Sequence, residues 1–287
     1  MTAELRDRVD DVLDRFLDHT DRRNELPGDA EVPLVDEVRR LLRAGGKRLR
    51  PTFCYWGFRA AGGADHGAPD APIVRAAAAL ELLHTMALVH DDLIDGAKER
   101  RGAPTTAARF AERADELGAR GDPEWFGRAI AVLVGDLAAV LADRLFISSG
   151  FPPDELVRGL AVYHPMREAM AAGQYRQLAG ERPRDAEAAR RAAALKGGGY
   201  TVDGPVRIGA AFAGAADAVD RCLSRFGAPL GEAFQLRDDL EDGDADPGVT
   251  RETVAELVAD AKRALDPAVL DEGAILPLTD LADRVAT

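Results

Sequence analysis

A long apolar segment that ends in three carboxylates constrains the fold of this chain more than any other feature. Residues 71–95 are mostly apolar and close on Asp91, Asp92 and Asp95. At about 100° per residue, Asp91 and Asp95 stand one turn apart on one side of a helix, where like charges repel each other. A buried helix that ends this way predicts a cation between the carboxylates, and ligands that are all oxygens favour a hard ion such as Mg²⁺.

The same pattern recurs at the end of a second apolar segment. Residues 230–236 are mostly apolar and are followed by Asp238, Asp239 and Asp242. A single acidic cluster at a helix end is more often a solvated surface. Two such ends that face one another can hold several cations and a diphosphate between them, because Mg²⁺ keeps coordination sites for water and phosphate oxygens.

Composition and charge narrow the class of protein. The 287 residues contain no Pro/Gly/Ser-rich linker, so we expect one domain over residues 1–287, and the net charge of −13 argues against nucleic-acid binding. Cys54 and Cys222 lack metal-ligand spacing and are expected as buried thiols in a reducing cytosol. The first residues lack the apolar core of a signal peptide, and no run is expected to reach the length of a membrane span, which predicts a cytoplasmic protein without membrane insertion.

Helical periodicity recurs along most of the chain, whereas alternation typical of β-strands is absent from the pattern. We therefore predict an all-α, single-domain bundle of about ten or more helices. The expected helices are residues 9–17, 35–42, 51–61, 71–95, 123–148, 154–173, 186–196, 201–214, 215–240 and 252–265, with a short one near 279–285.

Basic residues accompany the two acidic clusters. Lys47 and Arg50 follow a pair of glycines, Gly45 and Gly46, and stand at the start of a helix opened by Pro51, whose amide groups favour an anion. A turn with solvated basic groups is the alternative reading, and a lone histidine on an apolar helix is more often a core residue than a ligand. Further candidates near the clusters are His84, Arg100, Arg101 and Lys196.

Five ordered motifs carry a family resemblance: GGKRLRP (45–51), ELLHTMALVHDDLID (81–95), RRGAPT (100–105), Gly173-Gln174 and FQLRDDLED (234–242). With these motifs the chain resembles the trans-isoprenyl diphosphate synthases, or polyprenyl synthetases, which include geranylgeranyl and farnesyl diphosphate synthases. The resemblance runs from about residue 35 to residue 242. It implies an all-α bundle around a central cavity, usually homodimeric, with isopentenyl diphosphate and an allylic diphosphate as substrates and several Mg²⁺ ions as cofactors.

The resemblance also implies roles for individual residues. Isopentenyl diphosphate would be bound by Lys47, Arg50, His84 and Arg101. The allylic diphosphate or its cation would be contacted by Arg100, Lys196 and Gln235. Further substrate-binding residues would be Gly46, Gln174 and Thr201. Mg²⁺ would be held by Asp91, Asp92, Asp95, Asp238, Asp239 and Asp242. The residues nearest the chemistry would be Asp91, Asp92, Asp95, Lys196 and Asp238.

The reaction so implied is ionisation of the allylic diphosphate, attack by the double bond of isopentenyl diphosphate, and loss of a proton. Met86 and Ala87 lie one turn before the first aspartates, where the resemblance implies that bulky aromatic residues stop chain growth. Because neither is aromatic, we expect products beyond C15, with C20 favoured.

Three departures from the family pattern leave alternatives open. Gln177 stands where a carboxylate is expected, and Gly197 replaces a hydroxyl residue that Thr201 could supply one turn later. After Asp242, where members of the family have a lysine-bearing loop, the chain leads directly into a new helix, and no lysine occurs between Lys196 and Lys262. A terpene cyclase of the same fold, or a weakly active or regulatory subunit of a heteromeric prenyl synthase, are the competing interpretations.

Overall fold

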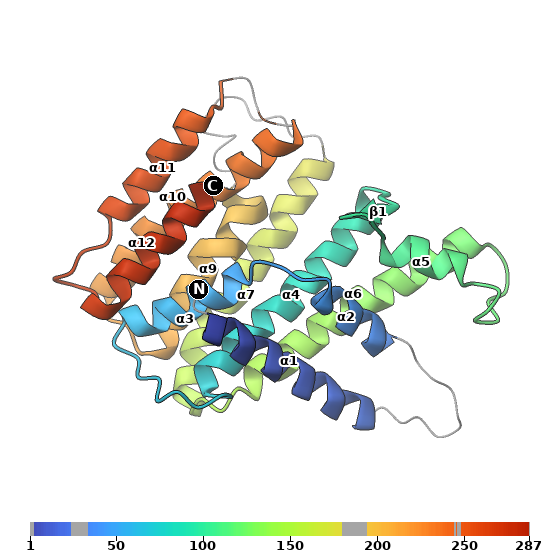
Figure 1. Ribbon diagram of the computed structural model, residues 1–287, viewed down its shortest axis with the longest axis horizontal. Helices are drawn as coiled ribbons and strands as arrows, with labels where there is room; N and C mark the ends of the chain where they lie inside the picture. Colours follow the sequence, from blue (N-terminus) through green and yellow to red (C-terminus); the bar gives the residue numbers. More distant parts are fainter. Residues whose placement is uncertain (1–2, 24–33, 180–193, 244, 246–247, 287) are drawn as a thin grey trace.

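The computed structural model describes residues 3–23, 34–179, 194–243, 245 and 248–286, and these form a bundle of helices (Figure 1). The all-α prediction is confirmed. The helices are α1 (Ala3–Arg23), α2 (Leu34–Arg43), α3 (Leu49–Ala60), α4 (Pro72–Ile94), α5 (Thr106–Glu112), α6 (Pro123–Ile147), α7 (Pro153–Leu178), the π-helical segment η1 (Ala194–Asp203), α9 (Gly204–Phe212), α10 (Asp217–Asp242), α11 (Arg251–Arg263) and α12 (Glu272–Ala286).

Helix α4 lies in the middle of the bundle and carries the first acidic cluster at its C-terminal end. It packs against α1, α2, α3, α6 and α9. Residues 76–79 are four alanines with no exposed surface, so neighbouring helices approach closely along this stretch. The expectation that no run is long enough to span a membrane was wrong, because Pro72–Ile94 meets the criteria of length and hydropathy. However, 67% of its most apolar window is buried within the protein, as in a core helix.

Two groups of buried apolar residues meet along α3 and α9. The first group joins α1, α2, α3, α4, α6, α7 and α9. The second joins α3, η1, α9, α10, α11 and α12. Adjacent residues of α3, Phe53 and Cys54, belong to different groups. A Cβ at Gly57 would collide with the Val206 carbonyl, and one at Gly209 with the Cys54 carbonyl, so glycine lets the two backbones touch.

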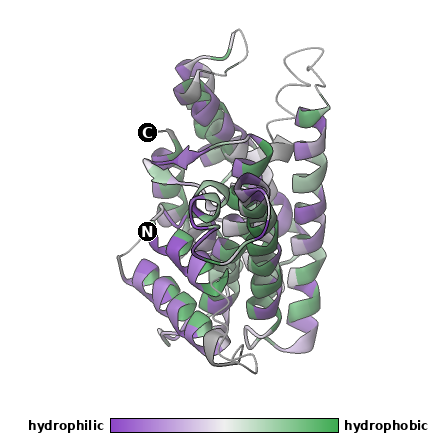
Figure 2. Cartoon of the chain, turned by 90° about the vertical axis from the view of Figure 1, so that its right-hand side faces the viewer, coloured by the Kyte–Doolittle hydropathy of each residue, from purple (hydrophilic) through white to green (hydrophobic). Residues whose placement is uncertain are grey.

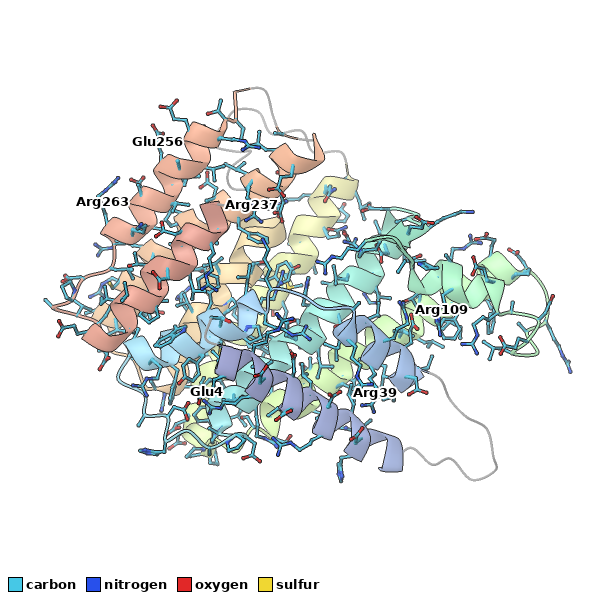
Figure 3. All side chains as sticks on the ribbon, viewed as in Figure 1. Glu4, Arg39, Arg109, Arg237, Glu256 and Arg263 are labelled. Carbon is cyan, nitrogen blue, oxygen red and sulfur yellow. The ribbon has the colours of Figure 1, made fainter. Side chains whose placement is uncertain are left out.

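The helices are amphipathic at the surface (Figure 2). On α11, for example, Val254, Leu257 and Val258 are buried, whereas Glu256 and Arg263 are exposed and point away from the bundle (Figure 3). This is the 3.6-residue pattern from which the helix was predicted.

Several boundaries differ from the prediction. Helix α5 was missed because it has only seven residues, and its signal is local: the Thr105 side chain accepts a bond from the Ala108 amide at its N-terminus. A hairpin of β1 (Glu99–Arg100) and β2 (Ala103–Pro104) was also missed. It turns at Arg101 and Gly102, which both have positive φ.

The remaining differences concern helix ends. Helix α12 begins at Glu272 and continues through Pro277, so it is longer than the short helix expected near 279–285. Of the predicted helix 186–196, residues 186–193 lie outside the described residues, and 194–196 belong to η1. The helix expected from 201 starts at Gly204, after the π-helical turns.

Candidate active site

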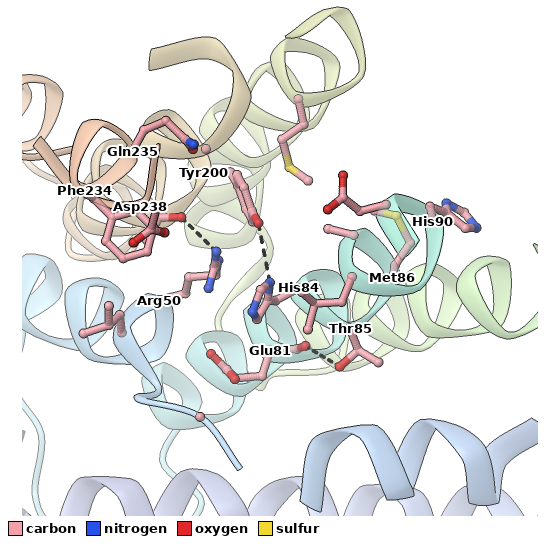
Figure 4. A pocket seen from close by; sticks show the side chains of 18 of the residues that line it. Arg50, Glu81, His84, Thr85, Met86, His90, Tyr200, Phe234, Gln235 and Asp238 are labelled. Atoms are coloured by element: carbon pink, nitrogen blue, oxygen red, sulfur yellow. Dashed lines mark hydrogen bonds between the residues drawn. The ribbon is translucent and has the colours of Figure 1, made fainter. Parts of the chain in front are cut away.

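A cavity of about 960 Å³ lies between α4, α7, η1, α10, the α2–α3 loop and the turn of the β1–β2 hairpin (Figure 4). Most of the residues singled out from the sequence line it. These are Gly46, Lys47, Arg50, His84, Met86, Ala87, Asp91, Arg100, Arg101, Gln174, Thr201, Gln235, Asp238 and Asp239.

Four of the predicted site residues are not among those that line the cavity. Asp92 is buried behind the cavity wall, whereas Asp95 is exposed at the end of α4. Lys196 belongs to η1 and Asp242 to α10, but their side chains lie outside the described part of the chain.

The first acidic cluster is held by hydrogen bonds from two neighbouring elements. Arg100 of β1 donates from Nε to Asp92 Oδ1 at 2.6 Å, and its Nη2 lies 3.4 Å from Asp91 Oδ2. Gln174 of α7 donates from Nε2 to Asp91 Oδ1 at 3.2 Å. Burial raises the pKa of Asp92, as do the charges of Asp91 and Asp95, and the Arg100 guanidinium opposes this shift.

The second cluster has a matching arrangement at the end of α10. Arg237 donates from Nη2 to Asp238 Oδ1 at 2.7 Å and from Nη1 to the Val285 carbonyl of α12 at 2.9 Å. Gln235 donates from Nε2 to Asp239 Oδ1 at 2.8 Å. Within the described residues, an arginine and an amide side chain are thus among the partners of each acidic cluster.

The donor chemistry of the two clusters fits Mg²⁺. Within the described residues, no three His, Cys, Asp or Glu side chains converge closely enough to form a closed metal site. Carboxylates of α4 and α10 instead line one cavity. Mg²⁺ is commonly held by one or two carboxylates, with substrate phosphates and waters as its other ligands, so an open, oxygen-lined arrangement suits it.

Cationic and aromatic side chains form a third side of the cavity (Figure 4). Arg50 donates from Nη2 to Thr201 Oγ1 at 2.8 Å, and its guanidinium carbon lies 4.3 Å from the centre of the Tyr200 ring. The Tyr200 hydroxyl is 3.5 Å from His84 Nδ1. Burial lowers the pKa of His84 well below its ordinary value, and the nearby arginines, Arg50 first among them, lower it further. His84 is therefore neutral at pH 7.

The structure shows which side chains surround two of the departures from the family pattern, at Gly197 and Gln177. A Cβ at Gly197 would collide with Oε1 of Gln235, so this position has no room for a hydroxyl residue while Gln235 keeps its place. Thr201 is fully buried and offers its hydroxyl to Arg50. Gln177 is exposed on α7.

Sequence reasoning missed Arg48, Glu81 and Tyr200, which also line the cavity. Glu81 offered a signal, because an acidic residue within an apolar helix requires a buried cation as a partner. Arg48 belongs to the GGKRLRP motif, but only Lys47 and Arg50 of that motif were predicted to bind a substrate. Tyr200 carried no signal of its own, since its place depends on the π-helical turns of η1.

A polyprenyl synthetase family model matches residues 32–264. A geranylfarnesyl diphosphate synthase from Aeropyrum pernix is 30% identical over 230 residues, which covers 78% of this chain and 66% of that protein. A nonaprenyl diphosphate synthase from Mycobacterium tuberculosis is 32% identical over 220 residues, covering 76% of this chain and 57% of that protein.

Among solved structures, a geranylgeranyl pyrophosphate synthase from Corynebacterium glutamicum, complexed with isoprenyl diphosphate and magnesium, superposes with a TM-score of 0.87 at 26% identity. The match covers 97% of both chains. The match to the family model extends over most of the chain and includes both acidic clusters, the basic loop and the hairpin. The chain belongs to the polyprenyl synthetase family.

Proposed function

We propose that this protein is a Mg²⁺-dependent trans-prenyltransferase that condenses isopentenyl diphosphate with an allylic diphosphate. One observation carries the proposal: two acidic helix ends and a cationic wall line the same cavity, so two diphosphates can be bound next to each other. The names of the relatives, which are prenyl diphosphate synthases of several product lengths, support this reading.

Asp91, Asp238 and Asp239 line the cavity and are the first residues that would hold Mg²⁺, with Asp92, Asp95 and Asp242 completing the two clusters. When bound, Mg²⁺ stabilises the negative charge that develops on a departing diphosphate. Arg100 supplies a second positive group at the first cluster, where it can turn from the carboxylates toward a phosphate oxygen. We place the allylic diphosphate at this end, with Gln174, Lys196 and Gln235 as further contacts.

The other diphosphate fits the cationic wall. Lys47, Arg50 and Arg101 supply the charge, and neutral His84 supplies a hydrogen bond without adding repulsion between cations. The Thr201 hydroxyl and the Tyr200 ring hold Arg50 in its direction.

The reaction begins when the allylic C–O bond breaks and its electrons leave with the diphosphate. The double bond of isopentenyl diphosphate then attacks the carbocation, and the proton lost at the end passes to the released diphosphate. The protein must exclude water, which would otherwise quench the cation, and the apolar residues of α4 and α7 serve this purpose.

We propose a C20 product as the favoured length. Met86 and Ala87 of α4 and Met170 and Ala171 of α7 line the cavity. These side chains are small or flexible, which leaves room for a chain longer than C15. Relatives named geranylgeranyl and geranylfarnesyl diphosphate synthase are consistent with this length.

We further propose a homodimer that forms through α6. Large apolar side chains are exposed along this helix at Trp125, Val132, Leu133, Val140 and Ile147, with exposed fractions between 43% and 62%. These residues form an apolar stripe on one side of α6, which Asp136 interrupts. An exposed apolar stripe marks an interface, and one face shared by two copies gives a two-fold dimer. We also propose that residues 1–287 form a single domain, because both groups of buried apolar residues include parts of α3 and α9. We propose a cytosolic location as well, because the two buried cysteines are free thiols, as is usual in a reducing compartment.

The deciding experiment incubates purified protein with isopentenyl diphosphate and each of the C5, C10 and C15 allylic diphosphates, with and without Mg²⁺. Products are sized by mass spectrometry. The proposal expects elongation that requires Mg²⁺. A hydrocarbon or alcohol formed from an allylic diphosphate alone would instead identify a terpene cyclase, and absence of elongation with every primer would identify a weakly active subunit. Neither the family model nor the relatives favour these two alternatives.

A further inference from the structure

The backbone of Arg48 has an unusual conformation. With φ of 49° and ψ of 39°, it occupies the left-handed region that residues with a Cβ avoid. Among the described residues other than glycine, Arg101 alone shares a positive φ, at 53°. At Arg101 the two-residue turn of a hairpin requires it. No hairpin surrounds Arg48, so other contacts must stabilise the conformation.

The Arg48 side chain supplies these contacts by joining three helices. Its Nε donates to Asp10 Oδ1 of α1 at 2.8 Å, and its Nη2 donates to the Leu42 carbonyl near the end of α2 at 2.9 Å. Its Nη1 donates to Glu81 Oε2 of α4 at 2.9 Å. Arg48 is 7% exposed and Glu81 is 4% exposed, so this last pair is shielded from water.

The bond to Glu81 connects the two parts of the cationic wall. Arg48 is flanked in the chain by Lys47 and, two residues later, Arg50. Glu81 lies one turn before His84 on α4, and both line the cavity. The Arg48 carbonyl also accepts hydrogen bonds from the Thr52 amide and hydroxyl, at 3.2 and 2.7 Å, which fixes the first turn of α3. The loop and α4 are thus held at a set distance by one buried ion pair.

We infer that Arg48 is a positioning residue of the isopentenyl diphosphate site: it holds Lys47 and Arg50 in register with His84 through Glu81. This inference rests on the proposed function and adds a residue to which the family resemblance assigned no role. Arginine is required because lysine has a single ammonium group, which cannot repeat the planar three-way geometry. The allylic end of the cavity, at Asp91, Arg100 and Asp238, makes no bond to Arg48.

The test compares Arg48→Lys with Arg43→Lys. Arg43 also links α2 to α1, through Asp14 at 3.0 Å, but it is 61% exposed and does not line the cavity. Both changes keep the charge, so a difference between them reports geometry. For each variant, KM is measured for both substrates, and binding of isopentenyl diphosphate alone is measured by calorimetry. Melting temperatures and circular dichroism check the fold.

We expect Arg48→Lys to weaken the binding of isopentenyl diphosphate and to raise its KM by about tenfold, the equivalent of about 1.4 kcal/mol. KM for the allylic diphosphate should change less than about twofold, and Arg43→Lys should leave both values unchanged. Glu81→Gln keeps the shape of its partner and should reproduce the selective effect in a milder form. It also serves if Arg48→Lys does not fold.

Equal increases in both KM values, or a lower melting temperature with unchanged kinetics in both Arg48→Lys and Glu81→Gln, would overturn the inference and leave the network a purely structural role. Failure of the proposed function gives a different result, because then the unaltered protein itself would neither bind isopentenyl diphosphate nor elongate an allylic primer. That result would remove the inference as well.

Discussion

Gly197 offers a sharp test of how the second acidic cluster is organised. Replacing it with alanine places a methyl group where Gln235 Oε1 now lies. The end of a glutamine side chain moves easily, so the backbone of η1 and α10 can stay in place while Gln235 turns away. The expected cost is the 2.8 Å hydrogen bond from Gln235 to Asp239, rather than the stability of the fold.

The size of the effect follows from that bond. Hydrogen bonds to charged groups contribute about 1.5–3 kcal/mol. Gln235 and Asp239 are both half-buried, so water weakens their bond and the lower end of this range applies. A loss of about 1.5 kcal/mol corresponds to a change of about tenfold in an equilibrium constant. We therefore expect Gly197→Ala to raise the Mg²⁺ concentration needed for half-maximal activity, or KM for the allylic diphosphate, by about this factor.

The assay is a double-mutant cycle in steady-state kinetics, with Gly197→Ala, Gln235→Ala and the double variant. If displacement of Gln235 is the mechanism, Gly197→Ala has no further effect once Gln235 is alanine. Gly198→Ala is the matched control, because its new methyl group would meet the Gly231 backbone rather than a side chain. This variant should lower the melting temperature, which Gly197→Ala should not. Unchanged kinetics in Gly197→Ala, or the same loss with and without Gln235, would refute the reasoning.

Three further predictions concern other parts of the molecule. Ala87→Phe should shorten the products, because the phenyl ring would enter the cavity one turn before Asp91. An unchanged product distribution by mass spectrometry would show that other residues limit the length of the product. Burial raises the pKa of Asp203 from 3.8 to about 6, so the folded state binds the extra proton between these pH values and this group's contribution to stability falls as pH rises through them. Asp203→Asn should therefore raise the melting temperature at pH 8 and lose this advantage below about pH 4, whereas an equal gain at both pH values would contradict the assignment. Leu133→Asp should convert the dimer into monomers in light scattering, because it introduces a charge into the exposed apolar face of α6; a dimer that persists would exclude this face.

The sequence predicted those features that depend on local patterns. The 3.6-residue periodicity placed seven of the described helices to within about three residues at both ends: α2, α3, α4, α6, α9, α10 and α11. Helices α1 and α7 are five or six residues longer than predicted at one or both ends, and the short α5 and the proline-containing α12 were missed or cut short. The acidic helix ends and the GGKRLRP loop were found because charged residues interrupt apolar runs. Most residues chosen on these grounds line one cavity, although the roles given to them stay predictions.

What the sequence could not give were contacts between residues far apart in the chain. The pairing of Arg48 with Glu81 joins the α2–α3 loop to α4, and neither sequence motif indicates which residue is the partner. The collision that excludes a side chain at Gly197 comes from α10 and depends on the π-helical turns of η1. Positive φ at Arg48 is likewise a consequence of its three partners, since arginine has no intrinsic preference for that conformation.

The arginines beside the two acidic clusters, Arg100 and Arg237, differ in how firmly they are held. The Arg100 side chain is 36% exposed and bonds to Asp91 and Asp92, so it can turn to a bound diphosphate. Arg237, which is labelled in Figure 3, is 11% exposed, lies over the Phe234 ring and donates to the Val285 carbonyl of α12. Its release from Asp238 toward a phosphate would break the contact with α12. The second cluster therefore has a cation beside Asp238 that a contact with α12 holds in place.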